Sequence, residues 1–99
     1  MKKKDVKHMH KEAAILALSD DYKERFQAEY LQLKLRAESL KKLLNRWEAY
    51  YNSNSDTELE KWLGFKPNCS KDLLERQLRC MYNYLEILEI RAEIEGIEL

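Results

Sequence analysis

The residues that most often bind metals or act as nucleophiles are few in this chain, which has two histidines and two cysteines. His8 and His10 are two positions apart, so on a helix their rings would point roughly 200° apart and could not share a metal ion. Ten residues separate Cys69 from Cys80, a spacing that matches no zinc finger. We therefore expect no metal site, an exposed histidine pair, a loop thiol at Cys69 and a core thiol at Cys80.

The sequence shows no set of groups arranged for acid–base catalysis or nucleophilic attack. Neither cysteine has a histidine and an aspartate at catalytic spacing. Glutamates recur among apolar residues near the C-terminus, as on a solvated helix face: Glu86, Glu89, Glu93, Glu95 and Glu98. Gly64 and Gly96 are isolated, so they form no phosphate loop, and both suit helix C-termini. The prediction is a protein that is not an enzyme and needs no cofactor.

The most informative polar pattern is a group of cations close to aromatic residues. Residues 34–46 hold five cations against one glutamate, whereas residues 80–99 hold five glutamates against one arginine. Cations beside aromatic rings can hold phosphates while bases stack on the rings. The candidate phosphate contacts are Arg36, Lys41, Lys42, Arg46, Arg76 and Arg79, and the candidate stacking residues are Tyr50 and Tyr51. The alternative is that these are solvated helix flanks and core aromatics.

Composition restricts the fold and the partners. Glycine and proline together number three, while 36% of residues are charged and 44% are hydrophobic, a balance that favours amphipathic helices. The 18 basic and 18 acidic residues cancel, which argues against general binding to duplex nucleic acid. No stretch reaches the roughly 20 apolar residues that cross a bilayer, and the apolar run after the N-terminal lysines is too short for an export signal. We expect a cytoplasmic protein with reduced thiols and no membrane contact.

These residues must be positioned by helices, and we predict a single all-α domain over residues 1–99 built on a long antiparallel helical hairpin. A short N-terminal helix is expected at 4–18, long helices at 21–51 and 71–95, and a short connecting helix at 56–63. Heptad spacing marks the facing seams, which are Phe26, Tyr30, Leu33, Ala37, Leu40, Leu44, Trp47 and Tyr51 on one helix and Leu74, Leu78, Met81, Leu85, Leu88 and Ala92 on the other.

Helix ends are predicted from capping residues. Asp21 with Glu24, and Ser55 with Glu58, have the spacing of capping boxes, and Ser70 is a candidate N-cap. The segment 52–55 is a helix stop. The lysine-rich stretch from Met1 to Glu12 is either a disordered arm or a cover for a partner.

A second apolar stripe runs beside the seam of each long helix. On the last helix it consists of Leu73, Cys80, Tyr84, Ile87 and Ile94, and on the first long helix it includes Leu31 and Leu35. Two helices cannot bury all of this surface on each other. The N-terminal helix can cover part of it, and self-association into a homo-oligomer is expected to cover the rest.

The spaced residues of the hairpin resemble a family of small phage proteins described as related to a crAss-like phage protein. The resemblance spans about residues 21–95 and lies in Glu24, Arg25, Phe26, Glu29, Tyr30, Leu33, Arg36, Leu40, Lys41, Leu43 and Leu44, followed by Leu73, Leu74, Gln77, Met81, Tyr84, Leu88 and Arg91. It implies a bacteriophage or prophage accessory protein acting in the host cytoplasm. In size and architecture the chain is also similar to phage anti-defence sponges, which oligomerise and sequester cyclic nucleotides.

Two functional hypotheses follow. The first is a homo-oligomer that counters host defence by sequestering a cyclic nucleotide, or another nucleotide-derived signal, between subunits. The second is an inhibitor or adaptor that docks on a host defence protein through the second apolar stripe and the acidic C-terminal helix. The sequence leaves open whether Arg36, Gln77 and Arg91 form a buried polar network or face a ligand.

Overall fold

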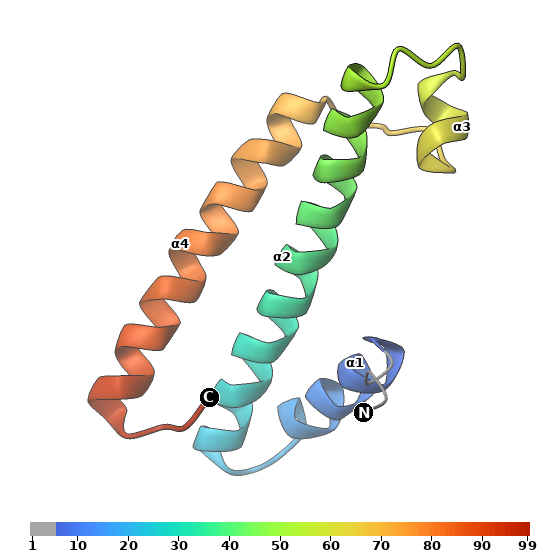
Figure 1. The fold of residues 1–99 in the computed structure, drawn as a ribbon. Coiled ribbons are helices and arrows are strands. Elements are labelled where there is room, and N and C mark those ends of the chain that lie inside the picture. The colour runs from blue at the N-terminus through green and yellow to red at the C-terminus, as the bar shows by residue number, and fades with distance from the viewer. Residues whose placement is uncertain (1–5) are drawn as a thin grey trace, which may run out of the picture.

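The computed structural model describes residues 6–99, which form four helices. These are α1 (Val6–Ala17), α2 (Tyr22–Asn52), α3 (Leu59–Leu63) and α4 (Lys71–Glu95). The helices α2 and α4 form an antiparallel hairpin, with α3 beside α2 at the end where the two are connected (Figure 1). The predicted all-α hairpin with two short helices is therefore confirmed. Of the lysine-rich stretch from Met1 to Glu12, residues 1–5 lie outside the described residues, and residues 6–12 form the first part of α1.

The hairpin core follows the predicted seams. One cluster joins Phe26 of α2 to Leu88 and Ala92 of α4 and includes Ile97, from the tail that folds back after α4. A second cluster joins Ala37 to Met81 and Leu85. Tyr30 and Leu33 pack against both clusters, so the two form one continuous interface along the hairpin. Heptad spacing predicts this packing because it keeps one face of each helix directed at the other over many turns.

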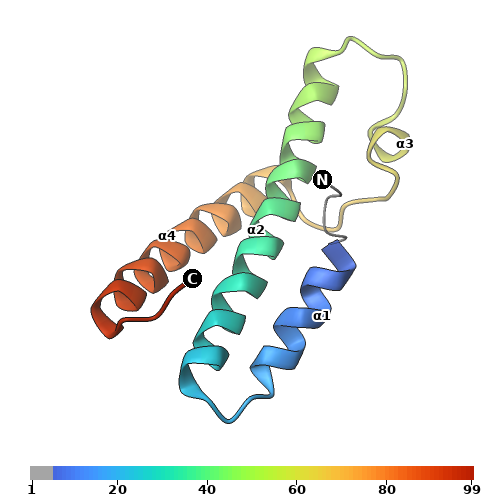
Figure 2. The ribbon, with the colours of Figure 1, turned by 60° about the horizontal axis from the view of Figure 1, so that its bottom comes forward.

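Helix α1 packs on α2 and makes no contact with α4 within residues 6–99. In Figures 1 and 2 it runs along one side of α2 while α4 lies on the other. Ala28 and Leu35 are buried on α2, although they lie roughly opposite Phe26 and Ala37 around the helix. Helix α1 therefore covers the second stripe of α2, as predicted, and leaves that of α4 uncovered.

The predicted helix ends are right at most positions. Asp21 caps α2 and accepts a hydrogen bond from the Lys23 amide, and Ser70 caps α4 by accepting one from Leu73. Gly64 and Gly96 have φ values of 84° and 70°, the left-handed conformation that ends a helix and that glycine adopts without strain. Helix α2 ends at Asn52, where the stop was predicted.

The predicted Ser55–Glu58 capping box is wrong. Glu58 itself is the N-cap of α3, without a side-chain hydrogen bond, and the Ser55 hydroxyl accepts instead from the Thr57 amide. Serine often bonds its own local backbone, and here that bond forms a turn before the helix. The helix consequently begins at Leu59, three residues later than expected.

Candidate anion-binding surface

The antiparallel hairpin brings the predicted cations of α2 and α4 to the same level along its length. Ala37 packs against Met81 and Leu85, and Lys71 Nζ lies 2.9 Å from Glu48 Oε2 nearer the connected end. Residues 36–46 of α2 therefore lie beside residues 71–82 of α4.

Five of the six predicted cations are exposed and make no hydrogen bond or ion pair with any residue in 6–99. These five, which we call the basic girdle, are Arg36, Lys41, Lys42, Arg76 and Arg79. Lys71 differs, since it pairs with Glu48 and Glu75 and these carboxylates raise its pKa. An exposed cation that has no ion-pair partner can bind an incoming anion without first breaking another contact. The basic girdle is thus the surface of the hairpin best suited to phosphate groups.

The members of the basic girdle lie on different sides of the hairpin. Lys41 lines an open cavity of about 430 Å³, together with Lys34, the aromatic residues Tyr30 and Tyr82, and three glutamates, Glu38, Glu86 and Glu89. Arg76 lines another, of about 340 Å³, with Leu73, Gln77 and Cys80. A single chain therefore divides these cations among separate shallow sites.

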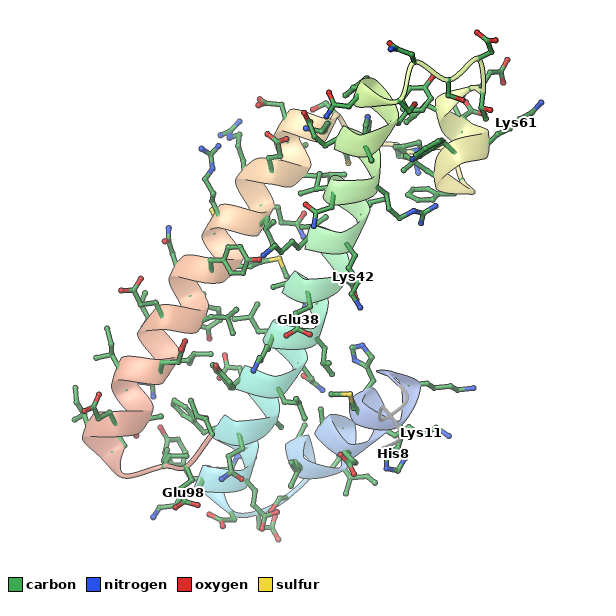
Figure 3. All side chains as sticks on the ribbon, viewed as in Figure 1. His8, Lys11, Glu38, Lys42, Lys61 and Glu98 are labelled. Atoms are coloured by element: carbon green, nitrogen blue, oxygen red, sulfur yellow. The ribbon has the colours of Figure 1, made fainter. Side chains whose placement is uncertain are left out.

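Arg36 and Lys42 occupy two further positions on α2. Arg36 comes two turns after Glu29, the residue that accepts a hydrogen bond from Tyr84, so it lies on the Tyr84 side of the hairpin. Lys42 comes two turns after the buried Leu35, and Figure 3 shows it directed to the side of α2 on which α1 lies. Neither side chain converges with Lys41 on one ligand position.

Arg46, the sixth predicted phosphate contact, is used to hold α3 against α2. Its guanidinium donates to the carbonyl oxygens of Trp62 and Leu63 at 2.9 and 3.1 Å. In return the Trp62 indole donates to the Arg46 carbonyl at 2.8 Å. These carbonyls belong to the last turn of α3, where a positive charge satisfies acceptors that have no partner within the helix.

The two predicted stacking tyrosines take part in an aromatic cluster near the connected end. The Tyr50 ring is half-buried and packs against Trp62 and Tyr51, with centroids 5.9 and 5.8 Å away. Tyr51 is 58% exposed, and its hydroxyl accepts a hydrogen bond from the Trp47 indole. Tyr51 is therefore the more exposed of the two candidate stacking residues, whereas Tyr50 lies between Trp62 and Tyr51.

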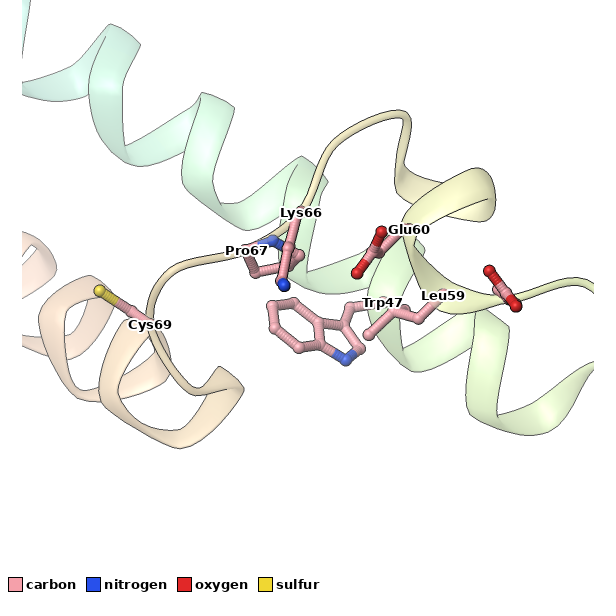
Figure 4. A pocket seen from close by; sticks show the side chains of 7 residues that line it. Trp47, Leu59, Glu60, Lys66, Pro67 and Cys69 are labelled. Carbon is pink, nitrogen blue, oxygen red and sulfur yellow. The ribbon is translucent and has the colours of Figure 1, made fainter.

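A cavity of about 500 Å³ lies between α2, α3 and the loop that leads to α4 (Figure 4). Its lining residues are Trp47, Glu58, Leu59, Glu60, Lys66, Pro67 and Cys69. The sequence does not predict this site, because its walls come from three segments whose meeting depends on where α3 packs. Its charged lining consists of two glutamates and one lysine, so it offers a phosphate one cation beside two acids.

The three polar residues whose roles the sequence left open have different surroundings. Arg91 donates to Glu95 at 3.2 Å and to the Tyr22 hydroxyl at 2.9 Å, and its guanidinium lies 5.0 Å from the Phe26 ring centre. Among residues 6–99 the Gln77 side chain makes one long contact, 3.9 Å, to the Met81 sulfur. Arg91 therefore holds the two helices together at the open end of the hairpin. The Arg36 side chain makes no hydrogen bond or ion pair with the residues that the structure describes.

The second stripe of α4, which we call the α4 face, is exposed along its length. It consists of Leu73, Cys80, Tyr84, Ile87 and Ile94, and every one of these residues is solvent-exposed. The prediction that the hairpin leaves apolar surface uncovered is confirmed. The prediction that Cys80 is a core thiol is wrong, because it faces away from α2 and no other described helix covers α4.

These features define a class of small all-α hairpin proteins with unpaired surface cations and an uncovered apolar helix face. Within residues 6–99 no helix is long and apolar enough to cross a membrane, and no three potential metal ligands gather. The chain belongs to the Sequestin family, whose model matches residues 20–94. The matched range contains α2, α3 and nearly all of α4, and it leaves α1 outside. Comparison with curated proteins and with solved structures gave no match.

Proposed function

We propose that this chain is a non-enzymatic binding protein that sequesters a small phosphate-bearing nucleotide, foremost a cyclic nucleotide signal, between subunits. The observation that carries this proposal is the basic girdle, whose five cations have no ion pair within residues 6–99. The family name, Sequestin, fits a sequestering function. Phosphate oxygens are the natural partners of exposed arginines, which can bind them through two parallel hydrogen bonds.

The spread of the cations around the hairpin supports binding between subunits. Arg36 and Arg76 lie on or beside the α4 side of the molecule, whereas Lys41 lines a different cavity. A small ligand cannot reach all of them on one chain. Contact between two chains would cover these shallow sites, so a ligand held by the cations of one chain would be enclosed by the surface of the other.

The biological role that we propose is that of a phage or prophage accessory protein in the host cytoplasm. A protein that binds a defence messenger tightly, without converting it, lowers the free concentration of that messenger in proportion to the number of binding sites. Such a protein needs an abundant, simple scaffold and no catalytic groups. The short hairpin of this chain suits that demand.

Isothermal titration calorimetry with a panel of cyclic di- and trinucleotides and ADP-ribose derivatives tests the proposal. We expect saturable binding to at least one compound, and recovery of that compound chemically unchanged after release. Arg36→Ala and Arg76→Ala should each weaken binding at least tenfold. Lys61→Ala removes an exposed cation of α3 outside the basic girdle and should bind normally. Absence of heat across the panel, or recovery of a cleaved product, would overturn the proposal.

A protein-binding inhibitor is the second candidate, and the uncovered α4 face favours it. Exposed apolar stripes of this length commonly mark protein interfaces. Affinity capture from a host lysate, compared between the unaltered chain and Ile87→Glu, would test this alternative. A defence-complex component retained only by the unaltered chain would support it and would count against a purely nucleotide-binding role.

A further inference from the structure

The α4 face remains uncovered although it is apolar enough to form an interface. Ile94 is 79% exposed, Ile87 is 53% exposed and Leu73 is 49% exposed, and the neighbouring Ile90 is 51% exposed. Helix α4 contacts α2 and none of the other helices in the described part of the chain. Its 25 residues span about 37 Å at 1.5 Å per residue, long enough for extended pairing with another helix.

The exposed side of α4 carries a heptad spacing of its own, separate from the seam that faces α2. The positions are Leu73, Arg76, Cys80, Asn83, Ile87, Ile90 and Ile94, in alternating steps of three and four. All seven residues are exposed. This spacing is typical of a helix that pairs lengthwise with a second helix, and the apolar members concentrate toward its C-terminal half. The geometry therefore points to a helical partner.

The distribution of charge along α4 indicates both which helix pairs with it and in which direction that helix runs. Residues 71–83 carry three cations and two acids, whereas residues 84–95 carry four glutamates and one arginine. Antiparallel pairing of two copies places the net positive half of each α4 opposite the net negative half of the other. Parallel pairing would align the four glutamates of one copy with the four of its neighbour, which is repulsive. The helix is thus complementary in charge to itself when reversed.

We propose that the α4 face is the interface of a homodimer in which the α4 helices of two copies pair antiparallel about a two-fold axis close to Asn83. In such an arrangement each copy contributes the same surface. The net positive half of each α4 lies against the net negative half of the other, so this favourable contact forms twice in the dimer. Arg79 of each copy then lies near Glu86 of the other.

The same pairing would cover the Arg76 cavity. Arg76 lies seven residues before Asn83 and Ile90 lies seven residues after it, so the axis places Ile87 and Ile90 of the second copy opposite Arg76. The cavity of about 340 Å³, now open, would gain an apolar wall and retain one arginine in each of two equivalent sites. The ligand assigned to this cavity rests on the proposed function, whereas the homodimer does not.

Light scattering on the purified full chain tests the interface without any ligand. We expect a dimer mass for the unaltered chain and a monomer mass for Ile87→Glu, with helix content by circular dichroism unchanged because Ile87 is not in the core. Ile15→Glu is the matched control, since Ile15 is 71% exposed on α1, and it should remain dimeric. A monomeric unaltered chain, or an Ile87→Glu variant that stays dimeric, would overturn the proposal.

Cysteine cross-linking tests the direction of pairing in a Cys69→Ser, Cys80→Ser background. With a short bismaleimide, Asn83→Cys should cross-link to itself because it lies near the axis. Leu73→Cys should not, because its two copies would be about 30 Å apart, but it should cross-link when mixed with Ile94→Cys. Efficient self-cross-linking of Leu73→Cys would indicate parallel helices and overturn the antiparallel dimer.

The proposed dimer and the proposed function can each be disproved without disproving the other. Arg76→Ala should remain dimeric by light scattering while binding the nucleotide at least tenfold more weakly. An intact, correctly cross-linked dimer that gives no heat with any nucleotide would reject the ligand and keep the interface. A monomeric chain that binds nucleotide would reject the interface and keep the ligand.

Discussion

The Tyr22 hydroxyl donates a hydrogen bond of 2.7 Å to Glu95 Oε1, joining the first residue of α2 to the last residue of α4. Arg91 completes this arrangement by donating to both of them. The hairpin is connected by the chain only at its other end, so these polar contacts, together with Phe26, hold the open end together. Arg91 is one of the residues that carry the family resemblance in the sequence, but only the packed hairpin shows which residues it contacts.

The tyrosines bonded to glutamates predict that stability falls at high pH. The hydrogen bond to Glu95 raises the pKa of Tyr22, and the hydrogen bond to Glu29 raises the pKa of Tyr84. A pKa that is raised in the folded state adds stability below the unfolded value of 10.0, and this is lost as pH rises through the folded pKa. The free energy of unfolding should therefore decrease above about pH 10.

Urea denaturation between pH 8 and pH 11.5 measures this dependence. Both Tyr22→Phe and Glu95→Gln should make the decrease shallower, because each removes the bond that favours the protonated phenol. An equally steep decrease in both variants would contradict the assigned role of the Tyr22–Glu95 pair.

Truncation of Leu88 should destabilise the fold strongly. Leu88 of α4 is fully buried and packs in one cluster with Phe26 of α2, so Leu88→Ala should lower the free energy of unfolding by about 2–5 kcal/mol. Leu18→Ala makes the same chemical change at a side chain that is 86% exposed and should alter stability by less than about 0.5 kcal/mol. Urea titration followed by circular dichroism compares them, and similar midpoints would be inconsistent with this core.

Removal of the hydrogen bond that caps α4 should lower the free energy of unfolding less than truncation of a core side chain does. Ser70→Ala deletes the hydroxyl that accepts from the Leu73 amide at 3.1 Å, and we expect a loss of about 0.5–2 kcal/mol. Ser70→Asp should retain most of the stability, because aspartate also caps. Ser55→Ala is the control, since the Ser55 hydroxyl accepts from the Thr57 amide in a turn and caps no helix. A loss as large as that of Ser70→Ala would contradict the start of α3 at Leu59.

Removal of the Arg46 side chain should release α3 from α2. Arg46→Ala deletes the donors to the Trp62 and Leu63 carbonyls, so water should reach the Trp62 ring and shift tryptophan emission to longer wavelength. Lys42→Ala, one turn earlier on α2, removes a cation with no partner among residues 6–99 and should leave the emission unchanged. Identical spectra for both variants would show that Arg46 does not hold α3.

The sequence predicted the elements well and the surroundings of single side chains less well. Phe26, Ala37, Leu88 and Ala92 were assigned to the hairpin seam because heptad spacing is a property of each helix alone. Arg46 was assigned to phosphate binding because charge and position can be read from sequence, whereas its acceptors are carbonyls that only the docked α3 supplies. The cavity at Trp47 and Lys66 was missed for the same reason.

What the sequence determined by itself is local: the helices, most of their capped ends, the seam, and the presence of more apolar surface than two helices can bury. Only the tertiary structure decided which part of that surface is covered. Leu35 is 4% exposed because α1 folds onto its side of α2, whereas Ile87 stays exposed because no described helix reaches α4 from outside. Periodicity identifies an apolar face, but the path of the chain through its turns determines which neighbour packs on that face.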